Sequence, residues 1–464
     1  MATTEGSERM ATADRALRVS EIIDQRPLSR FQSITILLCG LVLVLDGFDT
    51  QSIGFLAPSM AVSLHLSIHT FGPVFAAALI GLMLSSMIAG PLADRFGRKW
   101  PIVFATLTFA TFAIATARAT TFNELVAFRF LTGLGLGGAI PNVVALTTEY
   151  APRRMQQVLV TTLFCSMPFG ALLGGLVSSV MLPRWGWQSV FYVGGILPLI
   201  VAFLLIKVLP ESIRFLNMNG RDRYAINKIL SRIAPEIAEE EFDYSTSRED
   251  ERLKGVPVIH LFTEGRAIGT VLLWVPFFMN LLVLYFIISW LPVLLRQTHM
   301  PALAGIFGVS VFSLGGIAGS LLQGRLMNIW GRFVVLLSEF ALCLLLIGSL
   351  AFIASFPLMM MVTFLLGCFV QGAQAGLNAL SATFYPTSIR STGVGWALGI
   401  GRLGSIVGPI LGGIMISREW SLRQIFFAGA VPALLAALAI VLSYVLRSDP
   451  NPYRCKATIN AKIV

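Results

Sequence analysis

The chain alternates between long apolar segments and shorter polar connections. Each apolar segment is long enough for a helix that crosses a bilayer, which needs about 20 mainly apolar residues. One longer hydrophilic stretch, at 211–266, separates six segments from six. The twelve segments lie near 32–56, 70–92, 100–118, 122–149, 156–180, 188–209, 268–295, 302–324, 333–354, 357–384, 392–416 and 424–446.

This pattern predicts an all-α integral membrane protein with twelve transmembrane helices in two bundles of six. The first thirty residues are polar and basic, and no short apolar region with a cleavage site precedes the first span, so we interpret them as a tail and not a signal peptide. The expected parts are an N-terminal tail (1–30), a first bundle (31–210), a central loop (211–266), a second bundle (267–446) and a C-terminal tail (447–464).

Composition supports a membrane protein. Only 12% of the 464 residues are charged and 56% are hydrophobic, whereas soluble domains carry about 25% charged residues. These values exclude a soluble globular protein, a disordered chain and a disulfide-rich scaffold. The lipid bilayer is therefore the first expected partner.

The net charge of +10 predicts an orientation in the membrane, because Lys and Arg are enriched in cytoplasmic loops. With the N-terminus inside, the cytoplasmic loops carry Arg95, Arg98, Lys99, Arg153, Arg154, Arg325, Arg332 and Arg390. The loops on the other side carry only Arg118, Arg184, Arg296, Arg418 and Arg423. Both termini are expected in the cytoplasm, and no nucleic-acid partner is predicted.

A repeated motif indicates that the two halves are copies of one unit. Residues 90–98 read GPLADRFGR and residues 324–332 read GRLMNIWGR, with Gly, Leu, Gly and Arg coinciding at an offset of 234 residues. Each copy follows the second span of its half. Asn328 stands where the first copy has Asp94. Duplicated bundles of this kind are typical of secondary transporters.

The first copy is expected to form a tight cytoplasmic loop with a role in gating. Glycine permits a sharp turn and close approach of helices, which suits Gly90 and Gly97. Asp94, Arg95 and Arg98 can form salt bridges and helix-end contacts across a moving interface. An ordinary basic loop is the alternative, and the second copy disfavours it.

The motif, its copy and the division into six plus six spans resemble the major facilitator superfamily over nearly the whole chain. Arg129, followed by Gly133, Gly135 and Gly137, is similar to the fourth-span motif of that superfamily. The run P210-E-S-x-R214 resembles a segment found in several branches, including sugar and organic-ion carriers.

Asp46 and Asp49 are the most informative residues inside a span. They share one helix face at i and i+3, and Asp46 lies about 15 residues, or about 22 Å, into the first segment. Acids at that depth are costly and usually functional, and their mutual repulsion makes a proton site plausible. The alternative is a structural ion pair with an Arg on a neighbouring helix.

The run L45-DGFDTQSIG-F55 resembles the aromatic acid:proton symporter branch of the superfamily, and both acids of that branch's motif are present. The resemblance implies import of a hydroxybenzoate-like carboxylate with a proton across the bacterial cytoplasmic (inner) membrane. It also implies that a proton gradient drives transport without a cofactor and that Asp46 and Asp49 couple the proton.

The remaining buried charges are candidates for substrate binding and for gating. Arg402, near the middle of the eleventh segment, can bind a carboxylate through two parallel hydrogen bonds, and Arg129 is a second candidate for substrate binding. For Arg402 an ion pair with one of the buried acids stays open. Glu149 and Arg390, at corresponding ends of the fourth and tenth segments, are interpreted first as gating charges and second as substrate contacts. The same resemblance implies that charges at these places are required for transport.

These features favour a secondary active transporter that imports a small aromatic carboxylate by proton symport through alternating access and acts as a monomer. The alternatives are a carrier for a sugar or another organic ion and a non-transporting membrane sensor. No nucleophile–base pair, metal-ligand cluster or ATP-binding motif is found in the sequence, so neither an enzyme nor a metal site is predicted.

Overall fold

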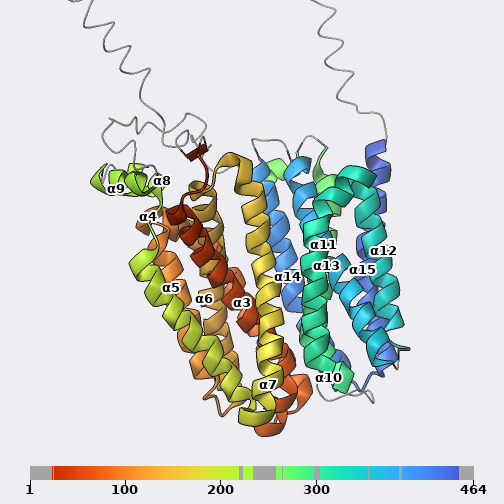
Figure 1. Ribbon diagram of the computed structural model, residues 1–464. Helices are drawn as coiled ribbons and strands as arrows, with labels where there is room; N and C mark the ends of the chain where they lie inside the picture. Colours follow the sequence, from red (N-terminus) through yellow and green to blue (C-terminus); the bar gives the residue numbers. More distant parts are fainter. Residues whose placement is uncertain are drawn as a thin grey trace, which may run out of the picture. The chain divides into compact units, whose positions relative to one another are not determined.

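The structure is a computed structural model, shown in Figure 1. It describes residues 23–24, 26–218, 223–233, 258–263, 265–296, 304–353, 355–385 and 389–448. Throughout these residues the chain is helical, with turns and short connections and no strand. The all-α prediction is therefore confirmed for the described part of the chain.

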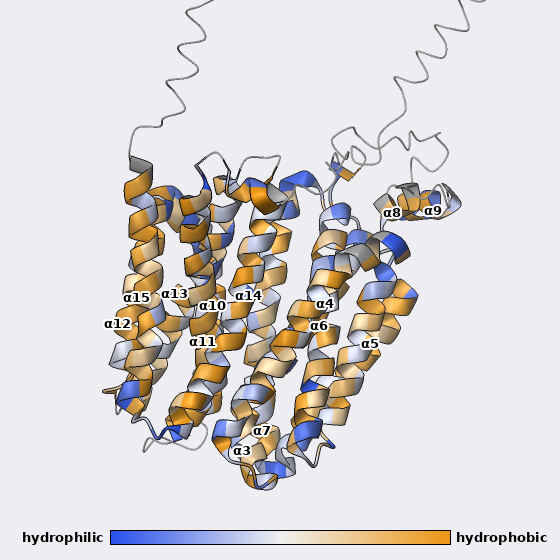
Figure 2. Ribbon diagram, turned by 180° about the vertical axis from the view of Figure 1, so that it is seen from behind, coloured by the Kyte–Doolittle hydropathy of each residue, from blue (hydrophilic) through white to orange (hydrophobic). Residues whose placement is uncertain are grey.

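Eleven helices of the described chain are long and apolar enough to cross a membrane, and apolar residues cover most of their length in Figure 2. They are α3 (Arg30–Ser63), α4 (Phe71–Phe96), α5 (Lys99–Thr116), α6 (Phe122–Tyr150), α7 (Arg153–Val208), α10 (Ala267–Arg296), α11 (Ala304–Trp330), α12 (Arg332–Ser349), α13 (Phe356–Phe384), α14 (Arg390–Ser417) and α15 (Leu422–Ser448).

The count of eleven is consistent with twelve predicted spans, because α7 contains two of them. Its 56 residues are interrupted at Gly186, whose φ of +75° lies outside the helical region. Pro183 precedes this break by three residues. The segments predicted near 156–180 and 188–209 lie on either side of it.

Shorter helices complete the described chain. They are η1 (Ile68–Thr70), α8 (Ile213–Met218), α9 (Arg223–Ile233) and η4 (Val258–Leu261). Helix α9 lies in the hydrophilic central stretch, yet its apolar face is buried in the core beside α3. Four of its side chains contribute to that core: Ile226, Ile229, Leu230 and Ile233.

Residue contacts divide the chain into two compact units. Unit 1 lies within 1–66 and 77–252, and unit 2 lies within 67–76 and 253–464. In unit 1, α3 packs along α7 and α5 packs along α6. In unit 2, the main pairs are α11 with α13, α10 with α14, α10 with α15, and α12 with α15.

Two details differ from the sequence predictions. The motif at 90–98 is not a loop throughout, because α4 continues to Phe96 and only Gly97 and Arg98 connect it to α5. Arg390 does not end the tenth span but begins α14. Helix α13 ends at Phe384 and Tyr385 is extended, with ψ of 139°, since a residue before proline avoids the helical region.

Candidate functional site

A buried ion pair joins the first and fourth spans in unit 1. The Nη1 and Nη2 atoms of Arg129 donate to Oδ1 and Oδ2 of Asp49 at 3.1 and 2.8 Å. The two side chains are 0% and 1% exposed. The structure therefore brings together two of the predicted site residues as a bidentate pair, the strongest geometry that these groups can form.

Glycines position the helices that carry this pair. A Cβ at Gly47 in α3 would overlap the backbone of Met167 in α7, and one at Gly170 in α7 would overlap the backbone of Val44. On α6, the Gly133 and Gly137 positions touch the α4 backbone, whereas Gly135 touches α5. The glycines after Arg129 thus let α6 pack closely against two neighbours.

Phe191, in the second span of α7, also contacts the Arg129 guanidinium. Its ring centroid lies 5.7 Å from Cζ of Arg129, within the range of a cation–π contact. The Nε of Arg129 is buried and has no hydrogen-bond acceptor in the described structure. The guanidinium is therefore held by Asp49 and the aromatic face, and it is closed to solvent.

Asp46 lies one helical turn before Asp49 and is also 1% exposed. Its Oδ1 accepts a hydrogen bond from Oγ1 of Thr50 at 2.9 Å. Of the two predicted proton-coupling acids, Asp49 faces the Arg129 guanidinium, and Asp46 accepts a hydrogen bond from the Thr50 hydroxyl. The structural ion pair considered as the alternative exists for Asp49.

Arg402 lies in α14 of unit 2 and is partly buried. The glycines beside it, Gly401 and Gly404, face the backbone of α10 at Phe277 and Phe278. Within the described residues no hydrogen bond or ion pair involves the Arg402 guanidinium. The observed partner of Asp49 is Arg129, and both lie in unit 1.

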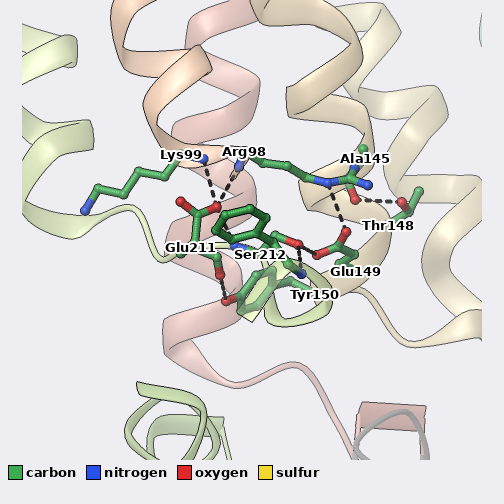
Figure 3. Close-up of polar contacts among 9 residues, drawn as sticks. Arg98, Lys99, Ala145, Thr148, Glu149, Tyr150, Glu211 and Ser212 are labelled. Carbon is green, nitrogen blue, oxygen red and sulfur yellow. Dashed lines mark hydrogen bonds and ion pairs between the residues drawn. The ribbon is translucent and has the colours of Figure 1, made fainter. Parts of the chain in front are cut away.

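A second polar cluster lies at the end of unit 1 where α4 meets α5 (Figure 3). Oε1 of Glu211 accepts from the backbone N–H groups of Arg98, Lys99 and Ser212 at 2.6, 3.1 and 2.8 Å. The first N–H groups of a helix have no partner within the helix. Glu211 therefore caps α5 from more than a hundred residues away, and its negative charge favours that end of the helix.

The same cluster holds the last turn of α6. Nε of Arg98 contacts Oε1 of Glu149 at 3.1 Å, and Oγ of Ser212 donates to Oε2 of Glu149 at 2.6 Å. The hydroxyl of Tyr150 donates to the backbone oxygen of Glu211 at 2.8 Å. Glu149 and Arg98, both predicted as gating residues, are thus linked to each other and to the segment that follows α7.

Gly97 is required in this cluster for two reasons. Its φ is +84°, a conformation that residues with a side chain rarely adopt. A Cβ at this position would also overlap the Glu211 carboxylate. The repeat copy has nearly the same φ, +85°, at Gly331, so the duplicated glycine has a positive φ in both halves.

The other predicted gating residues are not part of this cluster. A Cβ at Gly90 would meet no atom within 4 Å, so its predicted role in close helix packing is not seen. Arg95 is exposed and lies 5.4 Å from the ring centroid of Phe96. The side chains of Asp94 and Arg390 lie outside the described residues.

Two members of the cluster, Glu211 and Ser212, were not predicted as site residues. They belong to the P210-E-S-x-R214 run. The resemblance of that run to known segments does not indicate which residues Glu211 and Ser212 contact. The sequence separation between Arg98 and Glu211 does not indicate that these residues are in contact. Only the duplicated turn at Gly97, with an uncapped helix start after it, could have indicated that an acceptor was needed there.

Replacing Glu211 by Ala is expected to destabilise unit 1, because three backbone N–H groups would lose their acceptor. The expected loss is about 0.5–2 kcal/mol, the usual range for a helix N-cap. Glu211→Gln, which keeps one acceptor oxygen, should lose less. Thermal midpoints of the purified variants in detergent test the order, and equal midpoints for wild type and Glu211→Ala would contradict it.

Comparison with known proteins identifies the architecture. The family model of the Major Facilitator Superfamily matches residues 39–355 and 309–462. The 4-hydroxybenzoate transporter PcaK of Pseudomonas putida is 38% identical over 435 residues, covering 92% of this chain and 96% of that protein. The gallate transporter of Pseudomonas putida is 37% identical over 442 residues, covering 95% and 98%.

A solved structure has a similar fold. The xylose transporter XylE from E. coli, in a partially occluded inward open conformation, matches with a TM-score of 0.70 at 17% identity, covering 92% of this chain and 99% of that one. At this level of identity the likeness concerns the fold alone.

Proposed function

Because the chain belongs to the Major Facilitator Superfamily, we propose that it imports a small aromatic carboxylate together with a proton by alternating access. The chain is a multi-pass membrane protein and a transporter, not an enzyme. Relatives that match it over more than nine tenths of its length are named for 4-hydroxybenzoate and gallate. The observation that supports proton coupling is the buried group of Asp46, Asp49 and Arg129.

In this proposal the proton binds to the Asp46–Asp49 pair. Asp49 is matched by Arg129 in a bidentate pair. Protonating Asp46 leaves that pair intact, whereas protonating Asp49 would remove the counter-charge that faces the buried Arg129 guanidinium, which is costly. We therefore assign the exchanging proton to Asp46. Asp49 would hold Arg129 in position.

Arg402 is the proposed ligand of the substrate carboxylate. Its guanidinium is partly exposed within unit 2 and can form two parallel hydrogen bonds to a carboxylate. Arg129 is fully enclosed and paired with Asp49 in this structure. A contact of Arg129 with substrate would require that pair to separate, so Arg402 is the first candidate.

Replacing Arg402 by Lys is expected to raise KM for the aromatic acid about tenfold to a hundredfold. A lysine cannot make the paired hydrogen bonds, and one hydrogen bond to a charged group is worth about 1.5–3 kcal/mol. Arg418→Lys, an exposed residue at the end of the same helix, is the matched control. An unchanged KM for Arg402→Lys in an uptake assay would remove Arg402 from the binding site.

The Arg98–Glu149–Glu211 cluster is proposed to act as a gate. It ties the start of α5, the end of α6 and the segment after α7 by one ion pair and several hydrogen bonds that water can replace. Such contacts can break and re-form as the carrier alternates between states. Gly90, Asp94, Arg95 and Arg390 remain predicted members of the gating apparatus, together with Gly97 in the turn.

The proposed setting is the bacterial cytoplasmic membrane, with both termini in the cytoplasm and a monomer as the working unit. The distribution of Lys and Arg supports this orientation, and the bacterial relatives support the membrane. A proton gradient is the only energy source that the proposal requires, so no cofactor takes part.

Competition for uptake separates this function from its alternatives. Uptake of labelled 4-hydroxybenzoate and, separately, of labelled xylose is measured in cells that express the protein, with gallate and benzoate as unlabelled competitors of 4-hydroxybenzoate. Uptake of 4-hydroxybenzoate that both competitors reduce, and no uptake of xylose, is expected. Uptake of xylose alone would favour a sugar carrier, and uptake of neither would favour a sensor.

A further inference from the structure

A third buried acid lies in unit 2, remote in sequence from Asp46 and Asp49. Glu339 is in the middle of α12 and is only 4% exposed. A carboxylate inside a membrane bundle is costly unless a charge or several hydrogen bonds compensate for it. The proposed transport cycle assigns this residue no role, so its chemistry needs its own explanation.

The partner of Glu339 is an amide and not a cation. Nε2 of Gln323, on α11, donates to Oε2 of Glu339 at 3.1 Å, and this hydrogen bond is buried. Gln323 is itself 2% exposed. No salt bridge to Glu339 is found in the described part of unit 2, so nothing there neutralises an ionised carboxylate.

The ionisable groups on the surrounding helices lie mostly at their ends. Arg325 on α11 and Arg332 on α12 are exposed, and Arg332 donates to Thr383. Arg423, Tyr444 and Arg447 lie toward the two ends of α15. Two thiols, Cys343 on α12 and Cys368 on α13, lie close enough to Glu339 to interact with its charge.

Two oxygen atoms of the pair face the same point. A Cβ built on Gly372 of α13 would lie 3.0 Å from Oε1 of Glu339 and 3.2 Å from Oε1 of Gln323. Oε1 of Gln323 is buried and receives no hydrogen bond within the described structure. An amide oxygen accepts but does not donate, so these two acceptors, which lie 3.0 and 3.2 Å from the Gly372 Cβ position, would share no hydrogen if Glu339 is ionised.

A proton on Glu339 resolves this arrangement. The carboxylic acid would donate its O–H to Oε1 of Gln323, while Nε2 of Gln323 donates to the other carboxyl oxygen. Both side chains would then be satisfied in a neutral acid–amide pair with two hydrogen bonds. Burial of a neutral, fully hydrogen-bonded pair avoids the cost of a buried unpaired charge.

We propose that Glu339 and Gln323 form a second proton-binding site, in which a neutral carboxyl–carboxamide pair joins α11 to α12. Loss of the proton would leave a buried carboxylate that repels the amide oxygen, and it would weaken the contact between the two helices. A part for this site in proton coupling rests on the proposed function, whereas the protonation itself does not.

Infrared spectroscopy of the purified full-length protein tests the proposal with the proton itself as the probe. The wild type should show a protonated-carboxyl stretch at neutral pH that disappears at alkaline pH and shifts in heavy water. Glu339→Gln, nearly the same shape, should lack that band while keeping the wild-type thermal midpoint. The exchanged pair, Gln323→Glu with Glu339→Gln, should restore it.

A further variant separates this site from the first one. Asp46→Asn should retain the Glu339 band, because that acid lies in unit 1. A spectrum of Glu339→Gln identical to wild type, or an exchanged pair that lacks the band, would overturn the proposal. The measurement requires no transport, so failure of aromatic-acid uptake would count against the proposed function and leave this result standing.

Discussion

Replacing Asp46 by Asn is expected to abolish accumulation driven by a pH gradient while leaving substrate exchange intact. Asparagine imitates the protonated acid and cannot release a proton, so the carrier would remain in its proton-loaded form. Exchange of internal for external substrate needs no net proton movement and should continue. Accumulation against a gradient needs proton release and should fall to equilibration.

The size of this effect follows from the driving force. A gradient of one pH unit is worth about 1.4 kcal/mol per proton, enough for about tenfold accumulation of substrate. Proteoliposomes with an acidic exterior should show this ratio for wild type and a ratio near one for Asp46→Asn. Asp24→Asn, in the segment before α3, is the control. Wild-type accumulation by Asp46→Asn would remove Asp46 from the coupling mechanism.

Breaking the Asp49–Arg129 pair on one side is expected to be the most destabilising change in unit 1. Arg129→Gln leaves a carboxylate, and Asp49→Asn leaves a guanidinium, each enclosed without its partner. Removing one member of a buried pair costs about 3–5 kcal/mol. Each single variant should therefore show a much lower thermal midpoint and yield in detergent than wild type.

The double variant tests whether the pair acts through its charge. Asp49→Asn with Arg129→Gln leaves two neutral polar side chains that can hydrogen-bond, so much of the lost stability should return. A double-mutant cycle on thermal stability gives the coupling between the two residues. Additive losses in the double variant would show that the contact seen here does not hold α3 to α6.

The spans could be predicted from the sequence because apolar length is a property of each segment alone. Both spans of α7 are predicted from the sequence, and the structure has Pro183 and Gly186 at the break between them. The turn at Gly97 was placed correctly by the repeat, but α4 extends through the preceding residues. Helix propensity continues there until the glycine with positive φ ends the helix.

The partners of the charged residues could not be predicted in the same way. The sequence left open whether Asp49 pairs with an Arg, because helical periodicity shows which residues share a face but not which face meets which. Glycine contacts set that register, at positions such as Gly47 and Gly170. The acceptor at Glu211 was hidden for a similar reason, since its donors lie on a different helix.

Glu339 shows a further limit of sequence patterns. It is a single acid in an otherwise apolar segment, with no second charge nearby and no motif around it. Its importance appears only when Gln323 and Gly372, from two other helices, are seen around the same carboxyl group. Arg402 is the opposite case. The sequence around it suggests a binding function, whereas the described structure shows no partner for its guanidinium.

The central claim is that proton entry drives the import of an aromatic carboxylate. The most direct measurement is the uptake of labelled 4-hydroxybenzoate by proteoliposomes of the purified wild-type protein, with and without an inward proton gradient. The account predicts accumulation above the external concentration that a protonophore abolishes. Uptake that only equilibrates, at the same level with and without the gradient, would contradict it.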